Sequence, residues 1–203
     1  MPSMMNETER DEFGKILSSY ISEKTASALS MMLGTNVEHK LRSVVQKDLV
    51  ELDDIVPPFV DTITMNGVHL NTQGDLNVGL LFYMPLDSAK KLASKLLGEQ
   101  DLKDLTELGQ SSINEVGNIM AGSFFNAISD KTGFQLDGGV PGSGINDYRS
   151  LLEQPAAEIA SDSGDVVVSD VVLSGDDGTK IHVIILLNTE NAKKLVANHN
   201  SMN

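Results

Sequence analysis

The sequence contains no cysteine and no tryptophan, and it is poor in basic residues. Without cysteine the chain can form no disulfide, no thiolate zinc site and no cysteine nucleophile. Fifteen basic side chains stand against 29 acidic ones, a formal charge of −14. That charge repels phosphate backbones and anionic lipid surfaces, so we expect neither a nucleic-acid nor a membrane partner.

Long apolar runs are also missing. The longest, at residues 78–86 and 183–187, are far shorter than the roughly 20 residues that a transmembrane helix needs. The N-terminal stretch MPSMMNETERDEF has neither the basic region nor the continuous apolar region of a secretory signal peptide. With 40% hydrophobic residues, the sequence predicts a folded, cytoplasmic protein.

Two long helical patterns each open one half of the chain. The first covers residues 7–33 and ends at Gly34, and the second covers about 102–131 with Gly133 beyond its end. Each is followed by a short strand, a short helix or helical turn, a hairpin and a final helix. In the first half these are predicted at 37–45, 49–55, 62–84 and 87–97. In the second half they are predicted at 134–136, 148–154, 166–187 and 191–197, with GGVPGSG at 138–144 as a connector.

A short sequence repeat supports the shared order of elements. The tetrapeptide AKKL at 89–92 recurs at 192–195, and the same offset of 103 places EFGK at 12–15 on EVGN at 115–118. We therefore expect one domain, 1–203, made of two repeated halves at about 1–100 and 101–203. The expected fold class is α+β with pseudo-twofold symmetry, in which two long helices pack on a mostly antiparallel β-sheet.

One face of the second long helix carries an unusual row of polar residues. At about 100° per residue, an apolar stripe faces the core; it consists of Ile113, Val116, Met120, Phe124, Ala127 and Ile128. Ser111, Glu115, Asn118 and Gly122 lie nearly opposite this stripe and are expected to point outward. We call these four residues the polar ridge.

The composition of the polar ridge is unusual for a solvated helix face, which is normally rich in Lys, Glu and Arg. From residue 111 to residue 130 the only charged side chains are Glu115 and Asp130. Small side chains allow another protein to approach closely, and Phe125 at the flank would add an apolar contact. From these residues alone, an ordinary exposed helix face is the better explanation of the pattern.

The string ELGQSSINEVGNIMAGSFFNAISDKTGFQLDGGVP resembles the active-site helix of the CheC, CheX and FliY phosphatases. Their signature is Asp or Ser, three residues, Glu, two residues, Asn, twenty-two residues, Pro. Ser111, Glu115, Asn118 and Pro141 match every fixed position, including the long spacing. The repeated architecture and the chain length resemble CheC in particular, so the similarity covers nearly the whole chain.

The resemblance implies a phosphatase that acts on phosphorylated CheY or a related receiver domain. The receiver would supply the aspartyl phosphate and Mg²⁺, so the chain would need no cofactor or metal of its own. Asn118 would orient the attacking water, because an amide both donates and accepts hydrogen bonds. Glu115 would pair with a receiver lysine. Ser111 would give a supporting hydrogen bond or helix contact, and Pro141 would be structural.

The first half departs from the signature in two possible alignments. The offset of 103 puts Lys15 at the Asn position, with Thr8 and Glu12 before it. Counting back from the helix end puts Ile16 and Ser19 at the Glu and Asn positions instead. Neither alignment has an asparagine, and a lysine ammonium has no acceptor with which to orient water. We expect one working site.

Other motifs are less informative. The four histidines, at 39, 69, 182 and 199, show no metal-ligand spacing. The glycine-rich run at 138–144 has no lysine after it and follows the wrong element for a P-loop.

A non-catalytic function is the alternative. The resembling fold also occurs in the middle domain of the flagellar switch protein FliM, and CheC proteins bind the deamidase CheD. An adaptor for a receiver or for CheD, or a switch-like protein, is therefore possible. We expect no FliN-like domain, because the sequence ends at Asn203, and no N-terminal CheY-binding peptide. The presence of both Glu115 and Asn118 favours catalysis, because an adaptor has no evident need for a water-orienting amide.

Overall fold

The computed structural model describes residues 4–55, 65–160 and 163–203. Within them, seven strands form one sheet in the order β1-β6-β7-β3-β2-β4, with β5 also paired to β2. Every pairing is antiparallel, so the predicted α+β class is confirmed. The strands are β1 (Val37–Asp48), β2 (Met65–Gly74), β3 (Gly79–Pro85), β4 (Leu136–Gly138), β5 (Gly142–Asn146), β6 (Asp165–Gly175) and β7 (Lys180–Leu187).

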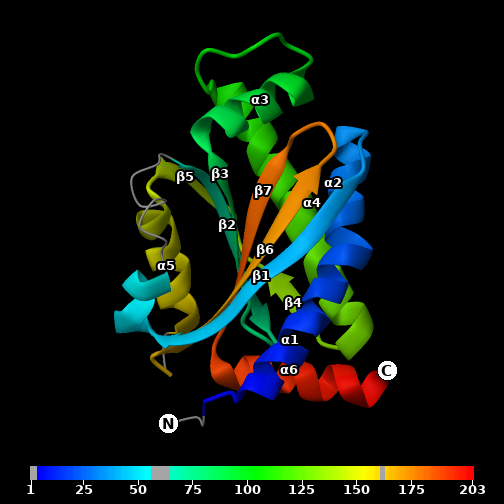
Figure 1. The fold of residues 1–203 in the computed structure, drawn as a ribbon, viewed down its shortest axis with the longest axis vertical. Helices are drawn as coiled ribbons and strands as arrows, with labels where there is room; N and C mark the ends of the chain where they lie inside the picture. The colour runs from blue at the N-terminus through cyan, green and yellow to red at the C-terminus, as the bar shows by residue number, and fades with distance from the viewer. Residues whose placement is uncertain (1–3, 56–64, 161–162) are drawn as a thin grey trace.

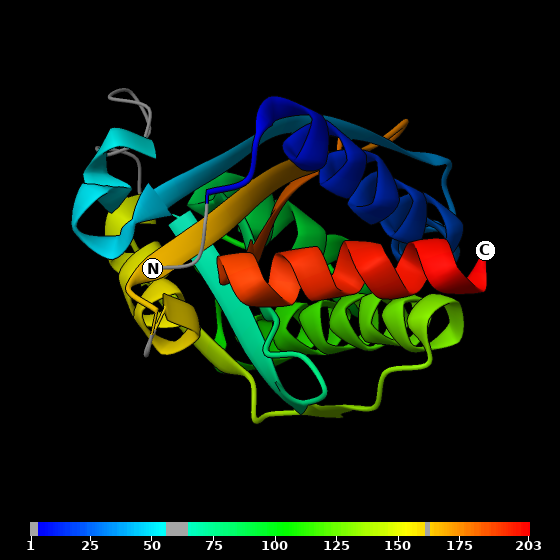
Figure 2. The same cartoon turned by 90° about the horizontal axis from the view of Figure 1, so that it is seen from below.

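The helices cover the two faces of the sheet unequally (Figures 1 and 2). They are α1 (Glu7–Tyr20), α2 (Ala26–Leu33), α3 (Leu86–Leu97), α4 (Glu107–Thr132), α5 (Tyr148–Ala160) and α6 (Thr189–Met202), with a 3₁₀ segment at Leu49–Ile55. The larger core lies between the sheet and every helix except α5. A smaller core joins α5 and the 3₁₀ segment to the opposite face. None of the helices in the described ranges is long and apolar enough to cross a membrane.

Most predicted elements are confirmed, with three differences. The second long helix begins at Glu107, directly after its N-cap Thr106, and not at about residue 102. The helix predicted to stop at Gln154 continues through Pro155 to Ala160, because Ala156, Ile159 and Ala160 are buried against the sheet. The GGVPGSG run is not only a connector, since its ends pair with β2 as β4 and β5. Of the hairpin strand predicted at 62–70, residues 62–64 lie outside the described residues.

The two long helices differ by one residue. The N-caps Asn6 and Thr106 each accept a hydrogen bond from a backbone N–H three residues later, and they are 100 positions apart. The left-handed glycines that end the helices, Gly34 and Gly133, are 99 positions apart. A π turn at Ile21–Thr25, between α1 and α2, accommodates the extra residue.

The sheet is symmetric about the β7–β3 pair. On one side of this pair, β6 is the neighbouring strand and β1 is the edge. On the other side, β2 is the neighbouring strand and the β4–β5 segment is the edge. Each edge also shifts register once. β1 shifts between Leu41 and Ser43, and between β4 and β5 the three residues 139–141 lie opposite residues 70–71 of β2. The two-half organisation stays a prediction, which this symmetry favours.

Candidate functional site

Helix α4 is held unusually close to the sheet. Its N-cap, Thr106, accepts a hydrogen bond from the backbone N–H of Gly109 at 3.1 Å. Near the middle of the helix, a Cβ added to Gly117 would lie only 2.9 Å from Cγ1 of Val68 on β2. Glycine at this position therefore brings the helix backbone against the strand, and the opposite helix face must point away from the core.

The polar ridge lies on that outward face, as predicted. Ser111, Glu115 and Gly122 are exposed, and Asn118 is half-buried. The six residues of the opposite stripe are each at most 3% exposed. A Cβ added to Gly122 would meet nothing within 4 Å, so the space above this part of the helix is open.

The functional groups of the polar ridge have no internal partners. Within the described ranges, the side chains of Ser111, Glu115 and Asn118 make no hydrogen bond or ion pair. A carboxylate without a cation and an amide without a hydrogen-bond partner are free to bind groups from another molecule. The arrangement presents one acceptor-only group, Glu115, and one donor–acceptor group, Asn118, a single helical turn apart.

Phe125 does not fit its predicted role as a partner contact. It is only 8% exposed, belongs to the larger core and lies 6.2 Å from Phe124 between ring centroids. The exposed apolar side chains on α4 are instead Leu108, at 61%, and Ile119, at 40%. Ile119 comes four residues after Glu115, so helical spacing could have revealed it.

A second apolar pair lies on the segment beside α4. Val140 is 91% exposed and Ile145 is 47% exposed. Asn114 Nδ2 donates to Ser143 Oγ at 3.2 Å, which ties β5 to the side of α4. Exposed apolar residues therefore occur both on α4 and on the segment beside it, and exposed apolar patches mark protein-binding surfaces.

Pro141 lies where the edge strand is interrupted. It is exposed and stands between β4 and β5, next to the point where the backbone N–H of Gly139 donates to the carbonyl oxygen of Asn71 at 2.8 Å. Proline has no N–H to contribute to a ladder, so it suits a break in pairing at a sheet edge. The structural role expected of Pro141 fits this position.

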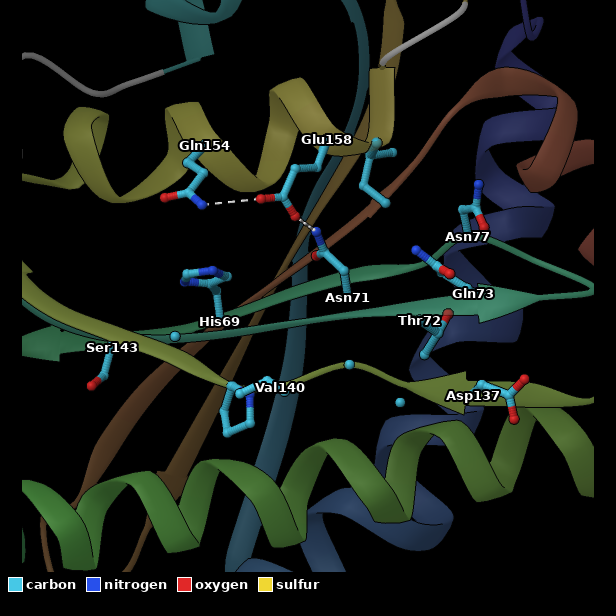
Figure 3. A pocket seen from close by; sticks show the side chains of 15 residues that line it. His69, Asn71, Thr72, Gln73, Asn77, Asp137, Val140, Ser143, Gln154 and Glu158 are labelled. Carbon is cyan, nitrogen blue, oxygen red and sulfur yellow. Dashed lines mark hydrogen bonds between the residues drawn. The ribbon is translucent and has the colours of Figure 1, made fainter.

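The same segment lines an open cleft of about 940 Å³ that the sequence did not suggest (Figure 3). The cleft lies between α5 and the β2–β4–β5 edge. Gly142 allows the His69 ring to pack on the strand, since an added Cβ would lie 2.2 Å from His69 Cε1. From β2, Asn71 Nδ2 donates across to Glu158 on α5, which also accepts from Gln154 Nε2 at 3.0 Å.

The histidines are dispersed. His39 contacts Ser18, His199 contacts Tyr20, and the His182 ring stacks on Tyr83 at 4.7 Å. In the part of the chain that the structure describes, no three His, Cys, Asp or Glu residues are grouped so as to hold a metal ion.

The structure corrects both sequence alignments of the first-half helix. At the spacing of 100 set by the N-caps, the buried residues Phe13, Ile16 and Leu17 correspond to the buried residues Ile113, Val116 and Gly117. A spacing of 103 would instead match buried Ile16 with exposed Ile119.

The corrected spacing pairs Asp11, Lys15 and Ser18 with Ser111, Glu115 and Asn118. Lys15 therefore takes the place of the glutamate and not of the asparagine. Ser18 stands at the asparagine position, and its Oγ lies 3.1 Å from His39 Nε2. The first-half helix has no amide at this position, as both earlier alignments also indicated.

Comparisons with known proteins agree with the geometry. A model of the CheC-like family matches residues 108–145, from α4 through most of β5. Over 180 residues the chain is 26% identical to the CheY-P phosphatase CheC of Bacillus subtilis (strain 168), with 84% of each protein covered.

Solved structures share the fold at low sequence identity. Thermotoga maritima FliY has a TM-score of 0.75 at 16% identity, covering 99% of this chain and 100% of that one. FliM–SpeE from H. pylori gives 0.66 at 12%, with 98% of both chains covered. A chain of the CheX–CheY–BeF3–Mg²⁺ complex from Borrelia burgdorferi gives 0.53 at 22%, with 84% and 97% covered.

Proposed function

Because the chain belongs to the CheC-like family, we propose that it hydrolyses the aspartyl phosphate of a CheY-like response regulator in chemotaxis or related two-component signalling. The observation that carries the proposal is the outward-facing pair of exposed Glu115 and half-buried Asn118 on α4, neither of which has a partner within the described ranges. The names of two similar proteins support it, since one is a CheY-P phosphatase and another was solved with CheY, BeF3 and Mg²⁺.

Asn118 is the residue that acts on the reacting water. Its carbonyl oxygen accepts a hydrogen from the water while its NH₂ donates to the phosphoryl group or its surroundings, which aligns the water with phosphorus. The side chain is half-buried on a rigid helix, so little conformational freedom is lost when it enters the partner's site. The phosphoryl group and the Mg²⁺ both belong to the partner.

Glu115 sets the position of the partner. A carboxylate is an acceptor only and therefore suits a lysine ammonium on the receiver. It precedes Asn118 by three residues, a rise of about 4.5 Å along the helix. An ion pair at Glu115 would therefore fix the partner's distance from Asn118 to within one helical turn.

The surroundings of this pair fit a protein partner. Gly122 and Ser111 have small side chains that protrude little from α4, so a partner protein can approach the helix closely. Leu108 and Ile119 supply apolar contact on α4, and Val140 and Ile145 supply it on the adjacent segment. Desolvated apolar anchors around a few polar groups are typical of protein interfaces.

The alternative is a non-catalytic adaptor or switch-like protein, which the similarity to FliM favours. Asn118 argues for catalysis, because a surface used only for binding has no need of an amide next to the docking carboxylate. Binding of CheD, expected from the resemblance, stays a prediction.

Release of inorganic phosphate from a phosphorylated receiver tests the proposal. Wild type should accelerate release, and the double variant Glu115→Ala, Asn118→Ala should not. Asn126→Ala provides the matched control, since Asn126 is an exposed asparagine on the same helix outside the polar ridge. Equal rates of phosphate release for wild type and the double variant would contradict the proposed phosphatase activity.

A further inference from the structure

A chain of side-chain hydrogen bonds links β2 to β5 through α4. Asn66 Nδ2 on β2 donates to Gln110 Oε1 at 2.6 Å. Gln110 Nε2 donates to Asn114 Oδ1 at 2.9 Å, and Asn114 Nδ2 donates to Ser143 Oγ at 3.2 Å. Because Gln110 and Asn114 each accept at the amide oxygen and donate from the amide nitrogen, the hydrogen bonds run in one direction, from the core to the surface. We call these four residues the amide relay.

The inner end of the amide relay fixes the rotation of α4. Asn66 is fully buried, and its Oδ1 has no partner within the described ranges. Loss of Gln110 would leave its Nδ2 unpaired as well, and an unsatisfied buried polar group is strongly unfavourable. Gln110 and Asn114 are four residues apart, and Asn118 is the next residue at the same interval. The relay therefore sets the direction in which Asn118 leaves the helix.

The outer end fixes the neighbouring segment. Ser143 pairs with Val68 of β2, whose side chain faces α4 beside Gly117, so Ser143 faces α4 as well. The chain reverses after Gly133, and the segment from Asp137 to Ser143 runs back along α4 (Figure 3).

We infer from this register that Pro141 lies near the level of Asn118 along α4. Two residues back from Ser143 cover about 6 to 7 Å of extended chain. Four residues on from Asn114 cover about 6 Å of helix. Both steps run in the same direction, so Pro141 comes level with Asn118. This accounts in physical terms for the long spacing between the asparagine and the proline.

We propose that the amide relay is a positioning device for the phosphatase reaction, and this inference rests on the function proposed above. Gln110, Asn114 and Ser143 touch neither the substrate nor the water. They hold α4 and the Pro141 segment in one register, so that the Asn118 amide meets the water at a fixed angle. Docking depends on Glu115 and the apolar residues, so loosening the relay should lower kcat and leave KM unchanged.

Ser143→Ala tests the proposal at the exposed end, where the fold is least at risk. It removes the terminal acceptor, and kcat for phosphate release should fall about 10-fold, since small misplacements of catalytic groups are costly in rate. KM and Tm should stay at the wild-type values. Ser143→Thr keeps the hydroxyl and should restore kcat. Ser27→Ala, at an exposed serine on α2, is the control and should have no effect.

The outcomes separate this proposal from the proposed function. The proposed positioning role of the amide relay would be overturned if Ser143→Ala kept the wild-type kcat. It would also be overturned if kcat fell in Ser143→Ala and Ser143→Thr did not restore it. If wild type releases phosphate no faster than Asn118→Ala, the proposed function fails instead. In that case the side-chain NH₂ resonances of Asn118 still test the relay. They should shift in Ser143→Ala and return in Ser143→Thr, and unchanged resonances would overturn it.

Discussion

Gly117 and Gly122 lie on opposite sides of α4, and the same substitution at each should have opposite effects on stability. Alanine is favoured over glycine in a helix interior by about 1 kcal/mol. At Gly122 an added Cβ meets nothing within 4 Å. Gly122→Ala should therefore raise the free energy of unfolding by about 0.5 to 1 kcal/mol.

At Gly117 the added Cβ would lie 2.9 Å from Val68 Cγ1 and 3.2 Å from Val68 Cβ. Rotation of the Val68 side chain moves Cγ1 but not Cβ, and Val68 is only 2% exposed, so the helix itself must shift. Overpacking of this kind destabilises by about 1 to 3 kcal/mol. After the gain in helix propensity, Gly117→Ala should lower the free energy of unfolding by about 0 to 2 kcal/mol.

Urea unfolding of the two variants, followed by circular dichroism, measures the contrast. Val68→Ala should remove the 2.9 Å contact with Cγ1 and leave only the 3.2 Å contact with Cβ, so the double variant Val68→Ala, Gly117→Ala should be more stable than the sum of the single effects predicts. Equal stabilisation by Gly117→Ala and Gly122→Ala would refute the close contact of α4 with β2. The outward position of the polar ridge would then lack its structural cause.

Three further predictions concern the partner surface, a buried carboxyl and the first half of the chain. Ile119→Asp should raise KM for the phosphorylated receiver about 5- to 30-fold by removing an apolar anchor. Val50→Asp, on the 3₁₀ segment that packs with α5, should leave KM unchanged. Equal KM values for Ile119→Asp and Val50→Asp would refute the apolar docking surface. Burial raises the pKa of Asp165, but hydrogen bonds from the Thr189 hydroxyl, the Thr189 backbone and other groups outweigh it, so the pKa lies below the ordinary 3.8. The stabilisation from the Asp165 carboxylate is fully present above pH 3.8 and is lost as pH falls through the lower pKa of the folded state. The unfolding free energies of wild type and Asp165→Asn should therefore converge in acid. A difference in unfolding free energy that stays constant with pH would contradict this. Lys15→Ala should leave phosphate release unchanged, and a large loss would show that the first-half helix takes part in catalysis.

The helices and the outward direction of the polar ridge could be predicted because they depend on local rules. Apolar spacing of 3.6 residues identifies the buried stripe of α4, and left-handed glycines end both long helices at Gly34 and Gly133. The burial of the Phe125 side chain could not be predicted in the same way. Phe125 comes seven residues after Asn118 and so lies on the side of the polar ridge, where only the packing of neighbouring elements explains its burial.

The failed predictions depended on tertiary contacts. Pro155 is unfavourable within a helix, yet burial of the following residues against the sheet keeps α5 intact. The glycines of residues 138–144 read as a loop, but β2 supplies a pairing partner from the other half of the chain. The π turn at Ile21–Thr25 has no sequence signature that we used, and it caused the one-residue error of the alignment counted back from the helix end, which put Ile16 and Ser19 at the Glu and Asn positions.

The central claim is that Asn118 performs the chemistry and Glu115 the docking. The most direct measurement is the decay rate of a phosphorylated receiver under saturating Asn118→Ala, with binding to the BeF3-loaded receiver measured in parallel. If Asn118 orients the water, Asn118→Ala should bind at the wild-type level while the decay rate falls about 10²-fold or more, the effect expected from loss of one positioned hydrogen-bonding group. Wild-type decay under saturating Asn118→Ala would contradict it.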